Sequence, residues 1–552
     1  MKLDNLTRSR WAGDALALLA GALLHLGMAP YGLWPLSLLS LTTFAWVLRG
    51  LPVKPCLRRS YAFGLGLYGA GTSWIYVSIS QFGNSSVALS LILTGVFVAA
   101  MALLFIPPFY LLGRLHKSPW AFWLGFPAVY VLGEWFHSWF LTGFPWLFAG
   151  YAFIDTPLAG WAPVFGVYGL TLAASIAGLC LVAMFLALWQ KNKNWPQAAA
   201  GLVLLGSIVF GGTTLQQHNW TQLSTTPINL ALVQPNIPQE EKWDPDYYAE
   251  NIGIYRGLSK DYWGKVDWLV WPEAAIPLPF HRAEAMLDSL DTQGKQTNTT
   301  FFSGIIYDDI KDDKYYNDIL AIGAGGSGQY FKQRLVPFGE YVPFDEQLRG
   351  LIEFFDLPTS IVHVGPPSRA LLRAKNIWLA PAICYELVYP ELIAQHSRDA
   401  NAIMSISNNA WFGNSIGPEQ HFEMARMRAL ETGRYLIHGT NNGVTAIINN
   451  KGGAELRVPR FVRQVATGTI YPAEGLTPFM LWGAWPVVLV AVLFLVFAWL
   501  RQTIVETESK IAVDAPQTAA PASEPADTEN SEKIAQKEET GEQGSAENQM
   551  AV

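Results

Sequence analysis

The segment Leu379-Ala-Pro-Ala-Ile-Cys-Tyr-Glu386 joins a strand-like apolar run to a cysteine and two polar side chains. Short apolar runs of this kind are typical of buried strands in α/β domains. A cysteine at a strand end can act as a nucleophile if a base lies nearby, whereas most single cysteines are small core residues. The other two cysteines offer no such context, because Cys56 lies in a short basic loop and Cys180 in a long apolar helix. The partners of Cys384 therefore decide its role.

Further strand-like runs lie on both sides of this segment and alternate with helical patterns. The predicted strands are 228–233, 266–271, 300–306, 377–384, 402–407, 435–439 and 444–448. The predicted helices between them are 247–258, 282–293, 389–397 and 419–432. This alternation over residues 215–475 predicts one α/β domain with a largely buried sheet. In such sheets, functional residues gather where strands end and loops begin.

The composition of the whole chain points to a membrane protein. Of its 552 residues, 51% are hydrophobic and 15% are charged, which is a low charge fraction for a soluble protein. Apolar runs long enough to cross about 30 Å of hydrocarbon recur. The predicted transmembrane spans are 12–28, 33–48, 61–81, 86–113, 120–140, 162–189, 197–214 and 478–500. The predicted fold class is therefore a polytopic helical bundle of about eight spans that carries an α/β domain.

The charges of the loops orient this bundle. No small-x-small cleavage site follows the first apolar run, so we expect a retained anchor rather than a signal peptide. The loops near 82–86 and 141–160 contain no Lys or Arg. The segments on the opposite side contain Lys2, Arg8, Arg10, Arg49, Lys54, Arg58, Arg59, Arg114, Lys117, Lys191, Lys193 and Arg501. Because cytoplasmic loops are enriched in Lys and Arg, both termini are predicted to be cytoplasmic. The α/β domain then lies outside the cytoplasm. In a bacterium this means the periplasm, and the expected location is the inner membrane, which the chain crosses several times.

These patterns divide the chain into four parts. They are a seven-helix bundle at 1–214, the α/β domain at 215–475, an eighth span at 476–503 and a tail at 504–552. The acidic tail is rich in Ala, Glu, Pro, Gln and Ser, so we expect it to be disordered. The formal net charge of −7 gives no reason to expect nucleic-acid binding. Three cysteines provide no disulfide framework.

Polar and aromatic side chains follow several of the predicted strands. Glu273 comes after a strongly apolar strand, where partial desolvation suits a carboxylate to proton transfer, although loop acids are common. Lys332 precedes a proline- and aromatic-rich segment around Glu340, so it either stabilises an oxyanion or is a surface lysine. Trp411 and Phe412 follow another strand and either wall an apolar pocket or close the core.

The order of Glu273, Lys332 and Cys384 along the chain resembles the Glu-Lys-Cys triad of the nitrilase superfamily. The whole chain, over about residues 10–500, is similar to the bacterial apolipoprotein N-acyltransferase family, in which a nitrilase-like periplasmic domain precedes the last of eight spans. The matching motifs are Val233-Gln-Pro-Asn-Ile-Pro238, Lys242-Trp-Asp244, Trp271-Pro-Glu273, Leu335-Val-Pro-Phe-Gly-Glu-Tyr-Val-Pro343, Ile383-Cys-Tyr-Glu386, Trp411-Phe-Gly413, Ser415-Ile-Gly-Pro418, Gln420-His-Phe422, Met424–Glu431 and Thr440–Ala446.

This resemblance implies an α-β-β-α sandwich and a two-step acyl transfer. Cys384 is the implied nucleophile, Glu273 the general base and Lys332 the stabiliser of the oxyanion. Glu340 is the implied supporting carboxylate, which orients Lys332 or assists proton transfer. The residues implied to bind the substrates or hold Cys384 are Trp243, Tyr341, Tyr385, Glu386, Trp411 and Phe412.

The same resemblance implies the substrates. A membrane phospholipid donates an acyl chain, which passes through a thioester on Cys384. The acceptor is the α-amine of the S-diacylglyceryl-cysteine at the N-terminus of an apolipoprotein. No metal or soluble cofactor is implied, and we expect a monomer. The segment 344–358 has apolar residues with interspersed charge, so it forms either a mobile lid or an ordinary amphipathic helix.

Two other classes of protein are compatible with parts of the pattern. A membrane-tethered amidase acting on a small nitrogen compound would use the same triad, but eight spans exceed what a tether needs. A transporter with a decayed catalytic domain would normally carry ionisable groups within its spans. The visible ones are only Asp14, His25, Glu134 and His137. The intact Glu, Lys and Cys also argue against decay.

Overall fold

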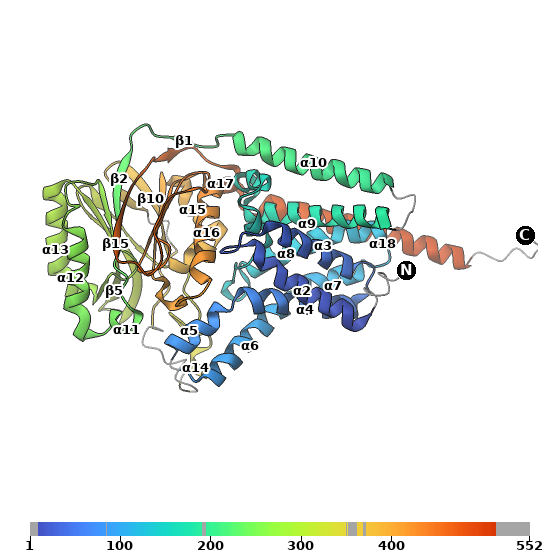
Figure 1. Ribbon diagram of the computed structural model, residues 1–552, viewed down its shortest axis with the longest axis horizontal. Helices are drawn as coiled ribbons and strands as arrows, with labels where there is room; N and C mark the ends of the chain where they lie inside the picture. Colours follow the sequence, from blue (N-terminus) through green and yellow to red (C-terminus); the bar gives the residue numbers. More distant parts are fainter. Residues whose placement is uncertain are drawn as a thin grey trace, which may run out of the picture. The chain divides into compact units, whose positions relative to one another are not determined.

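Figure 1 shows the computed structural model, which describes residues 9–83, 85–189, 195–348, 350, 361–367 and 371–514. The chain up to Val505 forms one compact unit, in which a helical bundle joins a domain built on two seven-stranded β-sheets. Most of the segment 344–358, expected to be either a lid or an amphipathic helix, lies outside the described residues, which include only 344–348 and Gly350 of it. The part of the predicted tail beyond Asp514 also lies outside them.

The bundle is built from apolar helices with short connections. Its helices are α2 (Arg10–Leu24), α3 (Trp34–Leu48), α4 (Val53–Gly71), α5 (Trp74–Phe82), α6 (Val87–Leu103), α7 (Ile106–Arg114), α8 (Pro119–His137), α9 (Ala162–Trp189), α10 (Trp195–Gln217), α17 (Pro478–Trp482) and α18 (Trp485–Asp514). Helices α2 and α4 pack backbone to backbone. A Cβ added at Gly21 would lie 2.0 Å from the carbonyl oxygen of Phe63, and one at Gly66 would lie 1.9 Å from that of Leu18. Small residues permit such an approach.

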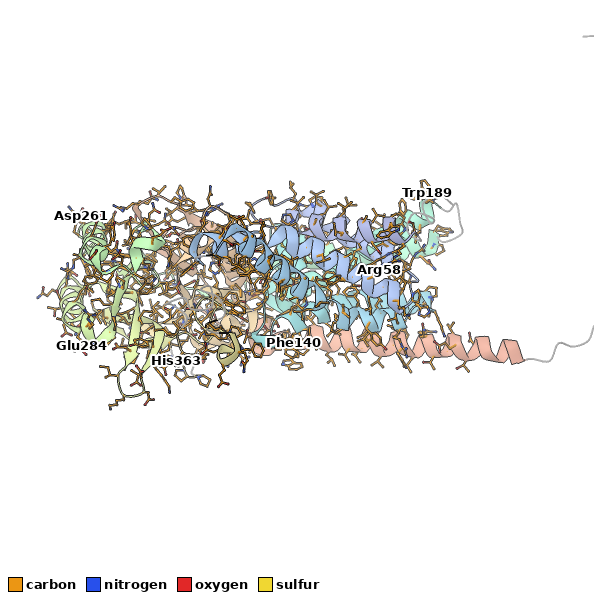
Figure 2. The ribbon with its side chains drawn as sticks, turned by 90° about the horizontal axis from the view of Figure 1, so that it is seen from below. Arg58, Phe140, Trp189, Asp261, Glu284 and His363 are labelled. Carbon is orange, nitrogen blue, oxygen red and sulfur yellow. The ribbon has the colours of Figure 1, made fainter. Side chains whose placement is uncertain are left out.

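Four helical segments among the described residues are long and apolar enough to cross a membrane. They are Val87–Arg114, Pro157–Trp189, Trp195–Gln217 and Trp485–Glu508. The other predicted spans fall on helices that are shorter or less apolar. The predicted span 61–81 is divided between α4 and α5, which part at Thr72 and Ser73. In Figure 2, Arg58 and Trp189 lie in the half of the bundle away from the sheets.

The α/β domain contains two seven-stranded sheets with central parallel strands, and β1 (Gln222–Leu223) pairs with β16 (Ala473–Glu474) in a separate two-stranded sheet. The first has the order β15 (Gln464–Ile470), β2 (Ile228–Gln234), β3 (Trp268–Val270), β5 (Thr300–Asp309), β6 (Lys314–Gly323), β8 (Gln329–Phe331), with β4 (Ile276–Pro279) beside β5. The second has the order β14 (Ala454–Arg457), β13 (Ala446–Ile448), β12 (Leu436–Thr440), β11 (Ala402–Ser407), β10 (Ile377–Ile383), β9 (Leu372–Ala374), β7 (Gly326–Ser327). The parallel pairs are β2–β3, β3–β5, β4–β5, β10–β11 and β11–β12.

The two seven-stranded sheets pack face to face, as the burial of alternate side chains shows. Leu230 and Leu232 of β2 share a buried core with Ile383 of β10, whereas Ala231 and Val233 face the opposite way. Helices α12 (Tyr248–Ser259) and α13 (Phe280–Thr297) cover the outer face of the first sheet. Helices α15 (Pro390–His396) and α16 (Gly417–Thr432) cover that of the second. The predicted α-β-β-α layering is therefore confirmed.

Helix α16 has two buried faces and connects the sheets to the bundle. Ala425 and Ala429 pack against the second sheet, while Met424 and Met427 belong to the core of the bundle. The helix also makes polar contacts across the junction, because Trp146 Nε1 donates to the side chain of Gln420 at 2.8 Å. The α/β domain and the bundle are therefore joined by a packed interface rather than by a linker alone.

Candidate active site

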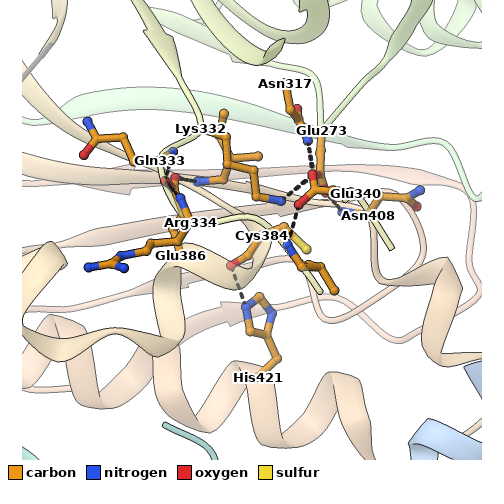
Figure 3. A network of polar contacts seen from close by, with 12 residues as sticks. Glu273, Asn317, Lys332, Gln333, Arg334, Glu340, Cys384, Glu386, Asn408 and His421 are labelled. Atoms are coloured by element: carbon orange, nitrogen blue, oxygen red, sulfur yellow. Dashed lines mark hydrogen bonds and ion pairs between the residues drawn. The ribbon is translucent and has the colours of Figure 1, made fainter. Parts of the chain in front are cut away.

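The predicted catalytic residues meet at one end of the two sheets. Glu273 follows β3, Lys332 follows β8 and Cys384 follows β10. Their side chains converge with those of Glu340 and Asn317 (Figure 3). β3 runs parallel to β2 and β5 in one sheet, and β10 runs parallel to β11 in the other. The ends of β3 and β11 meet between the sheets, because the N–H of Asn408 after β11 donates to Glu273 after β3. The sequence order Glu-Lys-Cys therefore becomes a cluster in space.

Each of the turns that carry Cys384, Glu273 and Glu340 contains a residue with positive φ. Cys384 itself has a φ of 52°, Ala274 after Glu273 has 44°, and Phe338 near Glu340 has 62°. Non-glycine residues rarely adopt such values, which are concentrated at functional sites. Gly304 of β5 leaves room for the Glu273 turn, since an added Cβ would lie 2.8 Å from the Cα of Glu273.

A network of short contacts joins the two carboxylates and the lysine. Lys332 Nζ lies 2.8 Å from Glu340 Oε1 and 3.5 Å from Glu273 Oε1. Asn317 Nδ2 donates to both carboxylates, at 2.8 Å to Glu273 and 2.9 Å to Glu340. The second oxygen of Glu273 accepts a hydrogen bond of 2.6 Å from the backbone N–H of Asn408. The lysine is 1% exposed, so this is a desolvated ion-pair cluster.

Electrostatics set the resting protonation of the cluster. Burial opposes ionisation of Glu273, but the charges of Lys332 and Lys242 outweigh it and lower the pKa of the carboxyl. Burial would lower the pKa of Lys332, yet Glu340 and Glu273 raise it above the ordinary value. Burial, together with the Glu273 carboxylate, raises the pKa of the Cys384 thiol to about 12. The resting site therefore holds a carboxylate, an ammonium and a thiol.

Glu386 holds the Cys384 turn to the Lys332 loop. Its Oε1 accepts hydrogen bonds from Tyr330 Oη at 2.7 Å and from the backbone N–H groups of Gln333 and Arg334 at 2.6 and 3.1 Å. Its Oε2 accepts from the N–H of Ile383 at 2.8 Å. The Glu386 side chain is fully buried. Of the two expected roles, contact with substrate or holding Cys384, these hydrogen bonds fit the second.

The aromatic residues expected at the pocket lie around the site and at the junction with the bundle. Trp243 is 38% exposed and Tyr341 is half-buried. Tyr385 is buried, and its hydroxyl donates to Gly143 O of the bundle at 3.1 Å. The ring of Trp411 contacts Phe82, and that of Phe412 contacts Trp74, with centroids 5.6 and 4.8 Å apart. Trp411 and Phe412 therefore help to join the domain to the bundle.

Four side chains or backbone groups of the site were not singled out from the sequence. They belong to Asn317, Asn408, Lys242 and His421. Asn317 and the backbone N–H of Asn408 donate hydrogen bonds to the Glu273 carboxylate. Lys242 Nζ donates a hydrogen bond of 2.8 Å to the Glu273 carbonyl. His421 Nε2 donates to the Cys384 carbonyl at 3.0 Å, and burial lowers its pKa to about 4, so the ring is neutral. Three of these residues stand in or beside segments that the sequence marks as motifs, but their partners are distant in the chain.

The arrangement can support addition to a carbonyl carbon. Cys384 is half-buried, unlike the buried Cys56 and Cys180. Glu273 can accept the thiol proton, and the Lys332 ammonium can stabilise an oxyanion. No group of three or more His, Cys, Asp or Glu side chains suited to a metal occurs among the described residues.

Comparison with known families identifies both halves of the chain. Residues 20–180 match the model of the apolipoprotein N-acyltransferase N-terminal domain. Residues 229–474 match that of carbon-nitrogen hydrolase. A solved carbon-nitrogen hydrolase superfamily protein of Xanthomonas campestris is 19% identical, with a TM-score of 0.35 over 45% of this chain and 91% of its own.

Curated relatives match almost from end to end. A protein of Azotobacter vinelandii named apolipoprotein N-acyltransferase is 44% identical over 516 residues, which cover 92% of this chain and 99% of the relative. One of the same name from Pseudomonas syringae pv. tomato is 42% identical over 508 residues, covering 91% and 99%. One from Coxiella burnetii is 38% identical over 493 residues, covering 88% and 100%.

Proposed function

We propose a Cys384 thioester mechanism for this chain, which belongs to the apolipoprotein N-acyltransferase family. It is an acyltransferase of lipoprotein biosynthesis associated with the inner membrane. The observation that carries the mechanism is the buried Lys332 between Glu273 and Glu340, beside a thiol on a strained turn.

The first step forms the acyl-enzyme. Sγ of Cys384 attacks an ester carbonyl of a membrane phospholipid, while its proton passes to Glu273. The Lys332 ammonium and a backbone N–H next to Cys384 stabilise the tetrahedral oxyanion, an effect typically worth about 10²–10³-fold per donor. The ester C–O bond then breaks, the lysophospholipid alkoxide takes the proton from Glu273, and a thioester remains.

The second step releases the acyl chain to the lipoprotein. The neutral α-amine of the diacylglyceryl-cysteine attacks the thioester carbon, and Glu273 accepts a proton from the nitrogen. The C–S bond breaks, the Cys384 thiolate regains the proton, and an N-acylated lipoprotein leaves. Glu273 begins and ends each step as a carboxylate, in keeping with its lowered pKa. Glu340 keeps Lys332 oriented through the cycle.

The membrane arrangement follows from the substrates. Both carry acyl chains, and exposing these to water would cost about 0.8 kcal/mol per CH₂. We place the domain on the periplasmic side of eight spans, with both termini cytoplasmic and the protein a monomer. The loop charges support this orientation. A cysteine at the exposed Lys295, labelled in spheroplasts by a membrane-impermeant reagent, tests it; protection until lysis would contradict it.

Six residues are proposed to contact the substrates or hold the nucleophile. They are Trp243, Tyr341, Tyr385, Glu386, Trp411 and Phe412. Trp243 is partly exposed beside Lys242, so we expect Trp243→Ala to raise the KM for the acyl donor. An unchanged KM would remove Trp243 from this set.

A reconstituted assay tests the function. The purified chain in detergent receives a phospholipid with a labelled acyl chain and a diacylglyceryl lipopeptide. We expect one labelled acyl chain on the peptide amine for each lysophospholipid formed, and none with Cys384→Ala. A peptide that stays unmodified while a small amide is hydrolysed would favour the tethered amidase.

A further inference from the structure

Lys242 is a second buried cation at the catalytic cluster. It ends the short helix α11 (Gln239–Lys242) and is 3% exposed. Its Nζ donates to the main-chain oxygen of Glu273 at 2.8 Å and lies 5.9 Å from the ring centroid of Trp243. Among the described residues, the Glu273 carbonyl is the one hydrogen-bond acceptor that the ammonium has. A buried lysine normally has partners for its charge, so this one needs an explanation.

The charges of the cluster supply the first part of that explanation. Two carboxylates, Glu273 and Glu340, contact a single ammonium, that of Lys332. When the thiol proton moves to Glu273, the negative charge moves to Cys384 and the sum stays the same. With Lys332 alone, this group of side chains would carry one excess negative charge in a desolvated place, which disfavours a thiolate. Lys242 balances that charge.

Backbone geometry supplies the second part. The Glu273 carbonyl belongs to the peptide that leads into Ala274, whose φ is 44°. A strained turn persists only where surrounding contacts fix it. The Lys242 bond ties this peptide to α11, while Gly304 packs against its other side. The direction in which the Glu273 side chain leaves the backbone is therefore held in part by Lys242.

We propose that Lys242 is a positioning residue for the acylation of Cys384, which fixes the Glu273 backbone and supplies the second positive charge of the site. This inference rests on the proposed thioester mechanism. It makes the ammonium, and not only the alkyl chain, necessary for the reaction.

The groups that titrate around Lys242 define a test. Glu273 and Cys384 interact with it directly, and Lys332 and Glu340 are linked to it through Glu273. Burial lowers the pKa of Lys242 to about 8, against the opposing pull of Glu273 and Cys384. Burial raises the pKa of the thiol to about 12, and the pKa of Lys332 lies above its usual value, so neither group titrates near pH 8. A loss of rate near pH 8 that disappears in Lys242→Arg, at constant folded fraction, therefore belongs to Lys242.

The experiment measures the rate of acyl-adduct formation on Cys384 in a single turnover with phospholipid, from pH 4 to pH 10. The full-length wild type is compared with Lys242→Met and Lys242→Arg. The matched control is Lys295→Met, which removes an exposed lysine of α13 whose partner is Asp291. Thermal unfolding of each variant is measured in the same detergent. If Lys242→Met does not fold, Lys242→Gln replaces it.

We expect Lys242→Met to slow acylation about 100-fold, similar to the loss of one fixed donor in an active site. In the pH–rate profile of Lys242→Met, the fall in rate on the acid side should move to higher pH, because the Lys242 charge lowers the pKa of Glu273. Lys242→Arg should keep most of the rate. Its rate should not fall near pH 8, because an arginine stays charged there. A Lys242→Met rate within about threefold of wild type with an unchanged pH profile would overturn the inference. Equal defects in Met and Arg variants would overturn it too. Absence of any adduct in the wild type would instead overturn the thioester mechanism itself.

Discussion

Two buried ion-pair clusters in this chain look alike and differ in what surrounds them. In the active site, Lys332 contacts Glu340 and Glu273 with 1% of its side chain exposed. In α16, Arg428 Nε lies 2.7 Å from Glu431 Oε2, with both side chains fully buried. Both clusters avoid an uncompensated buried charge.

The two clusters differ in the groups that lie around them. Glu431 accepts from the N–H of Val167 in the bundle at 2.7 Å, and Arg428 donates to Val388 O at 3.2 Å and lies over the Tyr151 ring. These contacts hold α16 between sheet and bundle, with no nucleophile among them. The Lys332 cluster instead adjoins a half-buried thiol on a turn of positive φ. Burial and pairing alone therefore do not mark a catalytic site.

The largest contrast should come from neutralising one carboxylate in each cluster. Glu273→Gln removes the proton acceptor, so acylation of Cys384 should fall by about 10³–10⁴-fold. Glu431→Gln should leave the rate per folded molecule near that of wild type. Single-turnover rates, normalised to the folded fraction, check this. Equal losses of acylation rate in the two variants would contradict the distinction between a catalytic and a structural cluster.

The opposite contrast should appear in stability. Arg428→Met leaves Glu431 buried without its cation, which should cost about 3–5 kcal/mol. Thermal unfolding in detergent measures the effect. The rate per folded molecule should be retained, because Arg428 touches no catalytic group. A variant as stable as wild type would show that the α16 pair does not hold the junction.

Within the active site, a smaller loss should follow from removing the amide that joins the two carboxylates. Asn317→Ala deletes hydrogen bonds to Glu273 and Glu340, each to a charged acceptor. Such bonds are worth about 1.5–3 kcal/mol, so acylation should slow by about 10–100-fold. The rate of adduct formation measures it. A rate equal to wild type would mean that Lys332 and the backbone N–H groups of Asn408 and Val336 orient the acids without Asn317.

The last prediction concerns the pH dependence of stability at α16. Burial raises the pKa of Glu423 from its usual value to about 8, and Ala29 N–H is its bonded partner at 3.0 Å. Because the folded pKa is raised, this group stabilises the fold below its ordinary pKa, and the contribution is lost as pH rises through about 8. Glu423→Gln should flatten thermal stability between about pH 5 and 8. An unflattened curve would contradict this assignment.

Much of the fold was predictable because apolar strands such as 228–233 and 402–407 have a local signature. The strand β6 was not predicted, since Lys314–Gly323 mixes charged, aromatic and apolar residues without clear alternation. The division between α4 and α5 was also missed, because hydropathy continues through Thr72 and Ser73. Periodicity reports local burial and not where a helix breaks.

The site was predictable as far as its order along the chain. Glu273, Lys332 and Cys384 each follow a strand, and resemblance to a family joined them. Lys242, Asn317 and His421 could not be assigned in this way, because their partners come from distant elements of both sheets and α16. The nearest signal for Lys242 was its place in the Lys242-Trp-Asp244 motif, which gave no hint that its ammonium binds the Glu273 backbone.

The central claim is the thioester on Cys384, and intact-protein mass spectrometry tests it most directly. The full-length protein is incubated with phospholipid without an acceptor and then digested to locate any adduct. We predict the mass of one acyl chain on the Cys384 peptide, stable until a diacylglyceryl lipopeptide is added and then lost to its amine. An adduct on another residue, or acyl transfer to the lipopeptide with no adduct at any time, would contradict the mechanism.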